Sequence, residues 1–265
     1  MYGILVDVTR CTGCERCVEA CVDANELNAA QAQIDRMRIA DGLSANRLIT
    51  LIQLPGGQFV RKGCMHCLEP SCVSACLVGG ITKSEDGPVI YDPDKCIGCR
   101  YCMLACPFHI PRYEWNSTHP YMVKCMMCFE RIKDNGKPAC VEACPNQVMQ
   151  FGDRDKLLEE AHKRIVGNPT LYKNHVWGEE EYGGTSIMYI SDVNLDVMDW
   201  PRTDALAIPE LTEPLISKTP VIGLSVAGSI LGLNWIIGRR MKLTSERNSR
   251  SENTTSKTGD KQDNG

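Results

Sequence analysis

Sixteen cysteines lie in four tight groups within the first 150 residues of this 265-residue chain. So many cysteines indicate either a disulfide framework, as in small secreted domains, or metal binding in a reducing compartment. Disulfide frameworks scatter their cysteines, whereas these recur in similar short groups, so an internal repeat organises the region 1–150. No charged and apolar export segment precedes the first group, which predicts that the chain carries no export signal of its own.

Two groups have the spacing C-x₂-C-x₂-C-x₃-C that is typical of bacterial ferredoxins. They are Cys11, Cys14, Cys17 and Cys21, and Cys96, Cys99, Cys102 and Cys106, the latter followed by Pro107. The other groups keep the opening and closing pairs but widen the middle gap, to four residues in Cys64, Cys67, Cys72 and Cys76, and to eleven in Cys125, Cys128, Cys140 and Cys144. A cubane takes one thiolate on each of its irons, and the fourth cysteine of such a group serves the neighbouring cluster. The sixteen cysteines therefore predict four [4Fe–4S] clusters with no cysteine left over.

Zinc is the alternative occupant of such sites. Zinc sites prefer paired C-x₂-C units, often with histidine, and do not need a third cysteine two residues further on. His66 lies between Cys64 and Cys67, and we expect it near a cluster or at the surface rather than as a ligand. The remaining histidines show no metal spacing among themselves: His109, His119, His162 and His175.

Local patterns predict an α+β fold with inserted hairpins and loops. Leu48–Leu54 and Phe59–Val60 flank a Pro-Gly-Gly turn and predict a hairpin, and Gly87–Asp92 predicts a short strand. Residues 153–165 predict an amphipathic helix that is capped by Asp153 and buries Leu157, Leu158, Ala161 and Ile165. Thr185–Ile190 predicts a further strand.

Twenty uncharged residues, Thr219–Gly238, are long enough as a helix to cross the ~30 Å core of a bilayer. We expect a transmembrane helix here, with Trp235 at the interface and small residues available for helix packing. Residues 239–265 are basic, lack large apolar side chains beyond Thr244 and predict a disordered tail. The expected regions are thus 1–150 (clusters), 151–218 (a helix and an extended wrap that contacts a partner), 219–238 (the span) and 239–265 (the tail).

The chain resembles the four-cluster, ferredoxin-like electron-transfer subunits of membrane-bound respiratory oxidoreductases. It is most similar among these to the formate dehydrogenase beta subunit and the iron–sulfur protein of periplasmic nickel–iron hydrogenases. The resemblance covers roughly residues 2–240 and rests on Cys11-Thr-Gly-Cys14-Glu-Arg-Cys17, Gly63-Cys64-Met-His-Cys67, Cys96-Ile-Gly-Cys99-Arg-Tyr-Cys102, Lys124-Cys125-Met-Met-Cys128 and residues 183–191. It implies two ferredoxin-like two-cluster units, the first cysteine group pairing with the fourth and the second with the third.

The resemblance also implies four ligand sets. Set 1 is Cys11, Cys14, Cys17 and Cys144; set 2 is Cys21, Cys125, Cys128 and Cys140; set 3 is Cys64, Cys67, Cys72 and Cys106; set 4 is Cys76, Cys96, Cys99 and Cys102. The chain departs from the ferredoxin pattern at Val22 and Leu77, where proline often follows the fourth cysteine. These departures remove no ligand, but they loosen a turn.

The sequence contains no G-x-G-x-x-G fingerprint in a strand–helix context and no nucleophile–base set, so we expect a non-catalytic electron relay. The resemblance implies a catalytic partner, a molybdenum or tungsten formate dehydrogenase or a nickel–iron hydrogenase, and a membrane cytochrome b or quinone-reactive partner. The modest net charge of −4 gives no reason to expect nucleic-acid binding.

Positive residues concentrate after the apolar segment, which predicts a cytoplasmic C-terminus and an extracytoplasmic cluster domain carried across by a signal-bearing partner. One alternative is a tail-anchored domain on the cytoplasmic side. Another is a subunit of a dimethyl-sulfoxide or polysulfide-type reductase with reversed electron flow. A membrane-tethered zinc or redox-sensing scaffold is an alternative of a different class.

Overall fold

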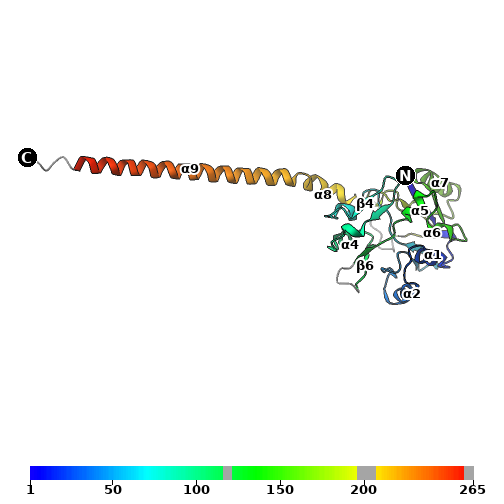
Figure 1. Cartoon of the computed structure of the whole chain (residues 1–265). Coiled ribbons are helices and arrows are strands. Elements are labelled where there is room, and N and C mark those ends of the chain that lie inside the picture. Colours follow the sequence, from blue (N-terminus) through cyan, green and yellow to red (C-terminus); the bar gives the residue numbers. More distant parts are fainter. Residues whose placement is uncertain (116–120, 196–206, 260–265) are drawn as a thin grey trace, which may run out of the picture. The chain divides into compact units, whose positions relative to one another are not determined.

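The structure is a computed structural model that describes residues 1–115, 121–195 and 207–259 (Figure 1). It divides into two units, Met1–Leu211 and Thr212–Gly265. The first unit contains every cysteine together with the described part of the segment that follows residue 150. The helix and strand expected after residue 150 therefore belong to the same compact unit as the cysteine groups.

A three-stranded sheet lies at the centre of the first unit. Strand β1 (Tyr2–Asp7) pairs antiparallel with β8 (Met149–Asp153) and parallel with β9 (Ile187–Ile190). Side chains alternate along a strand, so those of β1 point to opposite faces of the sheet. Leu5 packs against the helix Arg154–Gly167, whereas Ile4 and Val6 pack in the cluster that contains cysteines. The central strand is buried on both faces, which makes it nearly continuously apolar.

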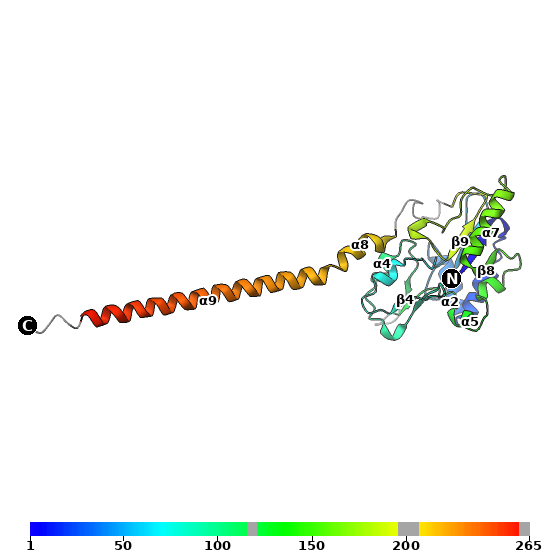
Figure 2. The same ribbon diagram turned by 90° about the horizontal axis from the view of Figure 1, so that it is seen from above.

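Helix α7 (Arg154–Gly167) covers one face of this sheet, as Figure 2 shows beside β8 and β9. Its residues Leu157, Ala161 and Ile165 pack with Leu5 of β1. The side chain of Asp153 accepts a hydrogen bond from the Lys156 N–H at 3.3 Å, which satisfies one of the free amides of the first turn. The predicted amphipathic helix and its cap are confirmed.

Three hairpins insert between the cysteine groups: β2 (Thr50–Gln53) with β3 (Phe59–Lys62), β4 (Ile81–Lys83) with β5 (Val89–Tyr91), and β6 (Arg112–Tyr113) with β7 (Met122–Val123). The first hairpin and the strand β5 were predicted. The third was not, because strands of two residues are too short to show a period. The predicted strand at Thr185–Ile190 begins at Ile187; Thr185 forms an isolated bridge with Cys67.

Short helices surround the cysteine groups. They are α1 (Arg16–Ala24), α2 (Ala29–Arg38), α3 (Ser71–Ser74), α4 (Tyr101–Ala105), α5 (Phe129–Lys133) and α6 (Ala139–Glu142), with 3-10 helices at Val8–Arg10, Pro93–Lys95 and Glu181–Gly183. Helix α1 packs against α6, and α3 packs against α4. Helix α2, which was not predicted, starts at Asn28, whose side chain accepts from the Gln31 N–H at 3.0 Å.

At the end of the described chain lie α8 (Ile208–Ile216) and α9 (Thr219–Gly259), the latter drawn as one continuous helix in Figure 1. Residues Thr219–Arg247 form one candidate membrane span by length and composition, with a mean hydropathy of 1.8 over an 18-residue stretch within it. The helix continues past Gly238 to Gly259, which differs from the disordered tail expected from residue 239, and residues 260–265 of that expected tail lie outside the described residues. Adding a residue to an existing helix costs little, and the Arg-Arg-Met-Lys-Leu run after the apolar stretch has good helix propensity.

Candidate iron–sulfur sites

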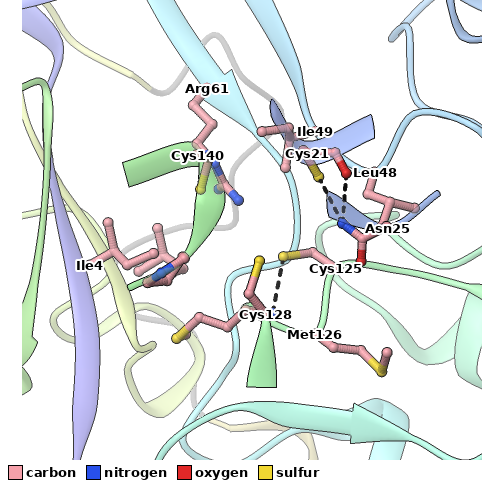
Figure 3. A pocket seen from close by; sticks show the side chains of 13 residues that line it. Ile4, Cys21, Asn25, Leu48, Ile49, Arg61, Cys125, Met126, Cys128 and Cys140 are labelled. Carbon is pink, nitrogen blue, oxygen red and sulfur yellow. Dashed lines mark hydrogen bonds between the residues drawn. The ribbon is translucent and has the colours of Figure 1, made fainter. Parts of the chain in front are cut away.

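Two cavities in the first unit are each lined by four cysteines from separate parts of the chain. Cys21, Cys125, Cys128 and Cys140 line the first, and Figure 3 shows their sulfurs around one shared space beside Arg61. The second is lined by Cys11, Cys14, Cys17 and Cys144. These quartets are the expected sets 2 and 1, and the packing of α1 against α6 brings each of them together. All sixteen cysteines are free thiols, so the disulfide interpretation has no support in the fold.

The other eight cysteines gather around the packed pair α3 and α4. Burial raises the pKa of the Cys67 thiol well above its ordinary value, and its charged neighbours include Lys83 and the three other members of set 3, namely Cys64, Cys106 and Cys72. Burial also raises the pKa of Cys102, whose neighbours include Cys96 and Cys99. Cys76, the remaining member of set 4, packs in the same apolar cluster as Cys102.

The four groups share a backbone conformation. The residue before each second cysteine has a positive φ: 72° at Gly13, 51° at His66, 68° at Gly98 and 56° at Met127. Non-glycine residues there are strained by about 1–2 kcal/mol, so the conformation is imposed by the loop. In this bent loop, the N–H of Gly98 donates to Cys96 Sγ at 3.4 Å and that of Met127 to Cys125 Sγ at 3.3 Å. The loop thus aims backbone amides at the sulfurs.

The last cysteine of each group also accepts a hydrogen bond from the residue four positions later. The donors are backbone amides at three groups: Gly80 to Cys76 Sγ at 3.2 Å, Ile110 to Cys106 Sγ at 3.5 Å, and Val148 to Cys144 Sγ at 3.3 Å. At the first group, α1 continues past Cys21 to Ala24, and the Asn25 side chain donates to Cys21 Sγ at 3.6 Å instead. Val22, in place of the proline, lets α1 continue, and Asn25 restores the contact to sulfur.

The donor set fits an iron–sulfur cluster. Burial raises the pKa of Cys17 to about 11 and that of Cys140 to about 12, so neither thiol ionises readily without added positive charge. Iron supplies that charge, because metal binding requires and stabilises the thiolate. No three His, Cys, Asp or Glu side chains in the described parts of the chain converge on one metal ion. The cysteines instead surround a space in fours, as a cubane with one thiolate on each iron requires.

Several polar groups at the sites were not predicted from the sequence. Arg61 lines both cysteine cavities and is 3% exposed. Burial has the largest effect on the pKa of Cys140 and raises it; the positive charge of Arg61 has the second largest effect and lowers it. Tyr113 Oη lies 3.3 Å from Cys102 Sγ. Lys83 Nζ donates to the carbonyl oxygens of His66 and Cys67 at 3.1 and 2.8 Å, and buried Lys124 donates to those of Val89 and Cys125.

His66 is fully buried, so of the two places expected for it, the surface is wrong. Its Nδ1 accepts a hydrogen bond from the Val89 N–H at 2.9 Å. Burial, and then the charge of Lys124, hold its pKa well below the usual range, so the ring is neutral. His119 lies outside the described residues.

Certain cysteines of different sets lie near one another. Besides burial, which is the main cause, charged cysteines of a neighbouring set raise the pKa of certain thiols. Three such pairs cross between sets: Cys17 with Cys140, Cys64 with Cys125, and Cys102 with Cys72. Cysteines of the expected sets 1 and 2, of sets 2 and 3, and of sets 3 and 4 thus lie near one another.

Comparison with known proteins agrees with this chemistry. Residues 56–154 match the model of the 4Fe-4S dicluster domain. The hydrogenase-2 operon protein HybA of Escherichia coli O157:H7 is 33% identical over 279 residues, covering 91% of this chain and 85% of the relative. The B subunit of anaerobic dimethyl sulfoxide reductase from E. coli K12 is 38% identical, covering 66% and 83%. The iron–sulfur subunit of nitrate-inducible formate dehydrogenase from E. coli K12 is 33% identical, covering 70% and 66%.

The chain belongs to the family of iron–sulfur electron-transfer subunits with [4Fe–4S] dicluster domains. Its sixteen cysteines, together with this family, give four [4Fe–4S] clusters, as predicted. A relative from Nitratidesulfovibrio vulgaris is 39% identical over 231 residues, but the chain spans only 62% of its length.

Proposed function

We propose that this chain is the electron relay between a catalytic oxidoreductase subunit and a quinone-reactive membrane partner, such as a cytochrome b. When bound, the four clusters supply one-electron transfer in series. The observation that carries the proposal is that cysteines of sets 1 and 2, of sets 2 and 3, and of sets 3 and 4 lie near one another, while set 1 and set 4 each include an exposed cysteine, Cys14 and Cys99. A set exposed to a partner lets electrons enter or leave, while the cysteines of sets 2 and 3 are shielded.

We further propose that the ligands are the four sets defined above, in two crossed two-cluster units. Two observations support this assignment. Sets 1 and 2 each line one cavity, although each draws cysteines from the first and the last group. The packing of α1 on α6 and of α3 on α4 pairs the first group with the fourth and the second with the third.

The surface around set 4 supports a protein partner there. Leu77 is 71% exposed, Ile97 64% and Leu104 80%, and all three lie within or beside the cysteine groups that form the set. Large apolar side chains at this exposure gain by burial against another protein. Because they lie in the sequence next to cysteines of set 4, which includes the exposed Cys99, they favour a contact through which electrons pass.

A hydrogenase type of complex, with a nickel–iron catalytic subunit, is favoured over a reductase type, and a molybdenum or tungsten formate dehydrogenase type, whose match covers 70% of this chain, stays proposed beside it. The match to HybA covers 91% of this chain, whereas the match to the dimethyl sulfoxide reductase subunit covers only 66%. The reductase match therefore leaves out about a third of this chain. That third is longer than the candidate span Thr219–Arg247. The direction proposed is from the catalytic subunit to quinone, and reversed flow in a reductase is the second candidate.

We propose that α9 anchors the chain in the membrane, with the C-terminus in the cytoplasm and the cluster unit outside. Arg239 lies over the ring of Trp235 at 5.3 Å, an aromatic and cationic pair of the kind that sits at a membrane interface. Arg240 and Lys242 follow directly, so positive charge concentrates beyond this end of the apolar stretch.

The relay proposal is tested by anaerobic purification of the tagged chain from mild-detergent membranes, followed by identification of every co-purifying subunit. We expect stoichiometric amounts of a formate dehydrogenase or nickel–iron hydrogenase catalytic subunit and a membrane subunit. A catalytic subunit of the dimethyl sulfoxide reductase type would establish the second candidate. Recovery of the intact chain with no oxidoreductase subunit would contradict both.

The sidedness is tested separately with a protease-cleavable tag after residue 265. In intact spheroplasts we expect the tag to resist added protease and the cluster unit to be accessible. In inside-out vesicles the tag should be cleaved. Cleavage of the tag in intact spheroplasts would overturn the orientation.

A further inference from the structure

Arg61 lies between two iron–sulfur sites. It belongs to β3 (Phe59–Lys62), and its side chain lines both the cavity of set 1 and the cavity of set 2. Figure 3 shows the guanidinium reaching into the cavity of set 2 beside Cys140. Tyr189 Oη donates to the Arg61 carbonyl oxygen at 2.9 Å and so fixes the backbone from which the side chain extends.

The guanidinium is charged but has no carboxylate partner in the described part of the chain. Arginine keeps its proton in proteins, and a buried charge without a counter-charge costs several kcal/mol. Nε and Nη1 of Arg61 are buried, and neither finds a hydrogen-bond acceptor among the described residues. The Arg61 side chain is hydrogen-bonded to that of Tyr189. Its Nε and Nη1 nitrogens and its full charge nevertheless remain without an acceptor among the described residues, beside two spaces lined by cysteines.

Other buried cations in this unit are differently placed. Arg47 is paired with Glu15 at 3.4 Å. Arg154 donates from Nε to the Thr185 carbonyl oxygen at 2.8 Å, and Lys83 donates to three carbonyl oxygens. Their hydrogen-bond donors already have acceptors, whereas Nε and Nη1 of Arg61 lack them among the described residues. The natural acceptors for Arg61 are the sulfur atoms of the clusters on either side.

We propose that Arg61 is the shared counter-charge of the clusters held by sets 1 and 2. Its Nε–H and Nη–H groups donate to sulfur, and its fixed positive charge favours the reduced form of both clusters. Reduction adds one electron from a donor or mediator to a cluster already carrying net negative charge, without making a bond or moving a proton. A cation in a dry site stabilises that added charge, so removing it lowers both potentials together. This inference rests on the ligand sets proposed above.

The test is an EPR-monitored redox titration of the anaerobically purified complex with Arg61→Met and Arg61→Lys. Signals are assigned beforehand with single Cys→Ser variants in each set. In Arg61→Met, we expect the ratio of reduced to oxidised cluster, measured at the wild-type midpoints of sets 1 and 2, to fall at least tenfold. A tenfold fall is a 59 mV shift for a one-electron couple. Sets 3 and 4 should change less than threefold, and Arg61→Lys should recover more than half of the shift.

Arg154→Met is the matched control, because it removes a buried arginine that bonds to backbone carbonyls and lines neither cavity. It should leave sets 1 and 2 within threefold. Unchanged ratios in an Arg61→Met protein that keeps its iron would overturn the proposal, as would equal shifts in Arg61→Met and Arg61→Lys.

Iron and sulfide counts separate this inference from the relay assignment. If Arg61→Met loses iron, Arg61→Lys decides alone. If Arg61→Lys keeps its full iron content and near wild-type ratios of reduced to oxidised cluster, the shared counter-charge is supported. If Arg61→Lys loses the clusters of sets 1 and 2 as Arg61→Met does, the shape of the guanidinium matters instead of its charge, and the proposal is overturned. A wild-type chain that binds less than one iron per cysteine would contradict the cluster assignment itself.

Discussion

Gly87 ties the second hairpin to the central sheet, and replacing it with alanine should weaken the unit that holds the clusters. The Tyr2 N–H donates to the Asp86 carbonyl oxygen at 2.7 Å, so β1 meets the β4–β5 turn directly. Gly87 has a φ of +116°, and a Cβ there would lie 2.5 Å from the Tyr2 carbonyl oxygen. Because that oxygen is backbone, it cannot swing aside.

Two costs add in Gly87→Ala. A non-glycine residue in such a conformation costs about 1–3 kcal/mol, and forcing an atom into an occupied space costs about 1–3 kcal/mol more. The total is about 2–6 kcal/mol. Gly57 is the matched control, since it lies in the turn of the first hairpin with a φ of +88° and nothing within 4 Å of the added Cβ. Gly57→Ala therefore carries the first cost alone.

The assay is the rate at which the anaerobic holoprotein loses its iron–sulfur absorbance at a fixed urea concentration, because unfolding with cluster loss is irreversible. Each 1.4 kcal/mol is about a tenfold change in rate if the cost is expressed in unfolding. We expect Gly87→Ala to lose absorbance at least about fivefold faster than Gly57→Ala, since the second cost alone is about 1–3 kcal/mol. Rates within about twofold of each other would refute the reasoning that the Tyr2 contact is rigid.

Three further predictions concern the sites and the anchor. Asn25→Leu removes the side-chain donor to Cys21 Sγ, which takes the place of a backbone amide. In a redox titration, the potential of the set 2 cluster should therefore fall by about 20–60 mV, on the order of 1 kcal/mol. Asn146 lines the set 1 cavity but bonds to oxygen, so Asn146→Leu should leave the potential of the set 2 cluster unchanged. Cys11→Ser and Cys144→Ser should alter the same EPR signal, because both cysteines line one cavity, and effects on different signals would break the crossed assignment. A chain ending at residue 211 should keep its iron but wash from membranes in salt, and retention of the truncated chain would show that α9 is not its main anchor.

The iron–sulfur chemistry could be predicted because several ligands of a ferredoxin-type cluster lie in one short loop. Three thiolates held by one short loop leave a fixed spacing, so Cys96, Cys99 and Cys102 are recognisable in isolation. Helix α7 was predictable for a similar reason: its apolar residues recur at helical spacing and its cap, Asp153, precedes it directly. Such local signals need no knowledge of the fold.

Residues that act on the sites from elsewhere in the fold gave no such signal. Arg61 reaches the clusters from a hairpin between the first two cysteine groups, and only the packing of β3 against the cysteine cavities reveals it. Asn25 is different, because the missing proline after Cys21 could have indicated a longer helix and a substitute donor four residues on. The helix was not predicted to continue past Gly238 because that prediction used only the polar composition of the tail. A helix that already exists is extended more easily than a new one starts, and α9 therefore runs on to Gly259.

The central claim is that the chain holds four [4Fe–4S] clusters on its sixteen cysteines. The most direct test is to count iron, acid-labile sulfide and zinc per chain in protein purified without oxygen. The account predicts about one iron and one sulfide per cysteine and no stoichiometric zinc. About four irons per chain, or stoichiometric zinc, would contradict it.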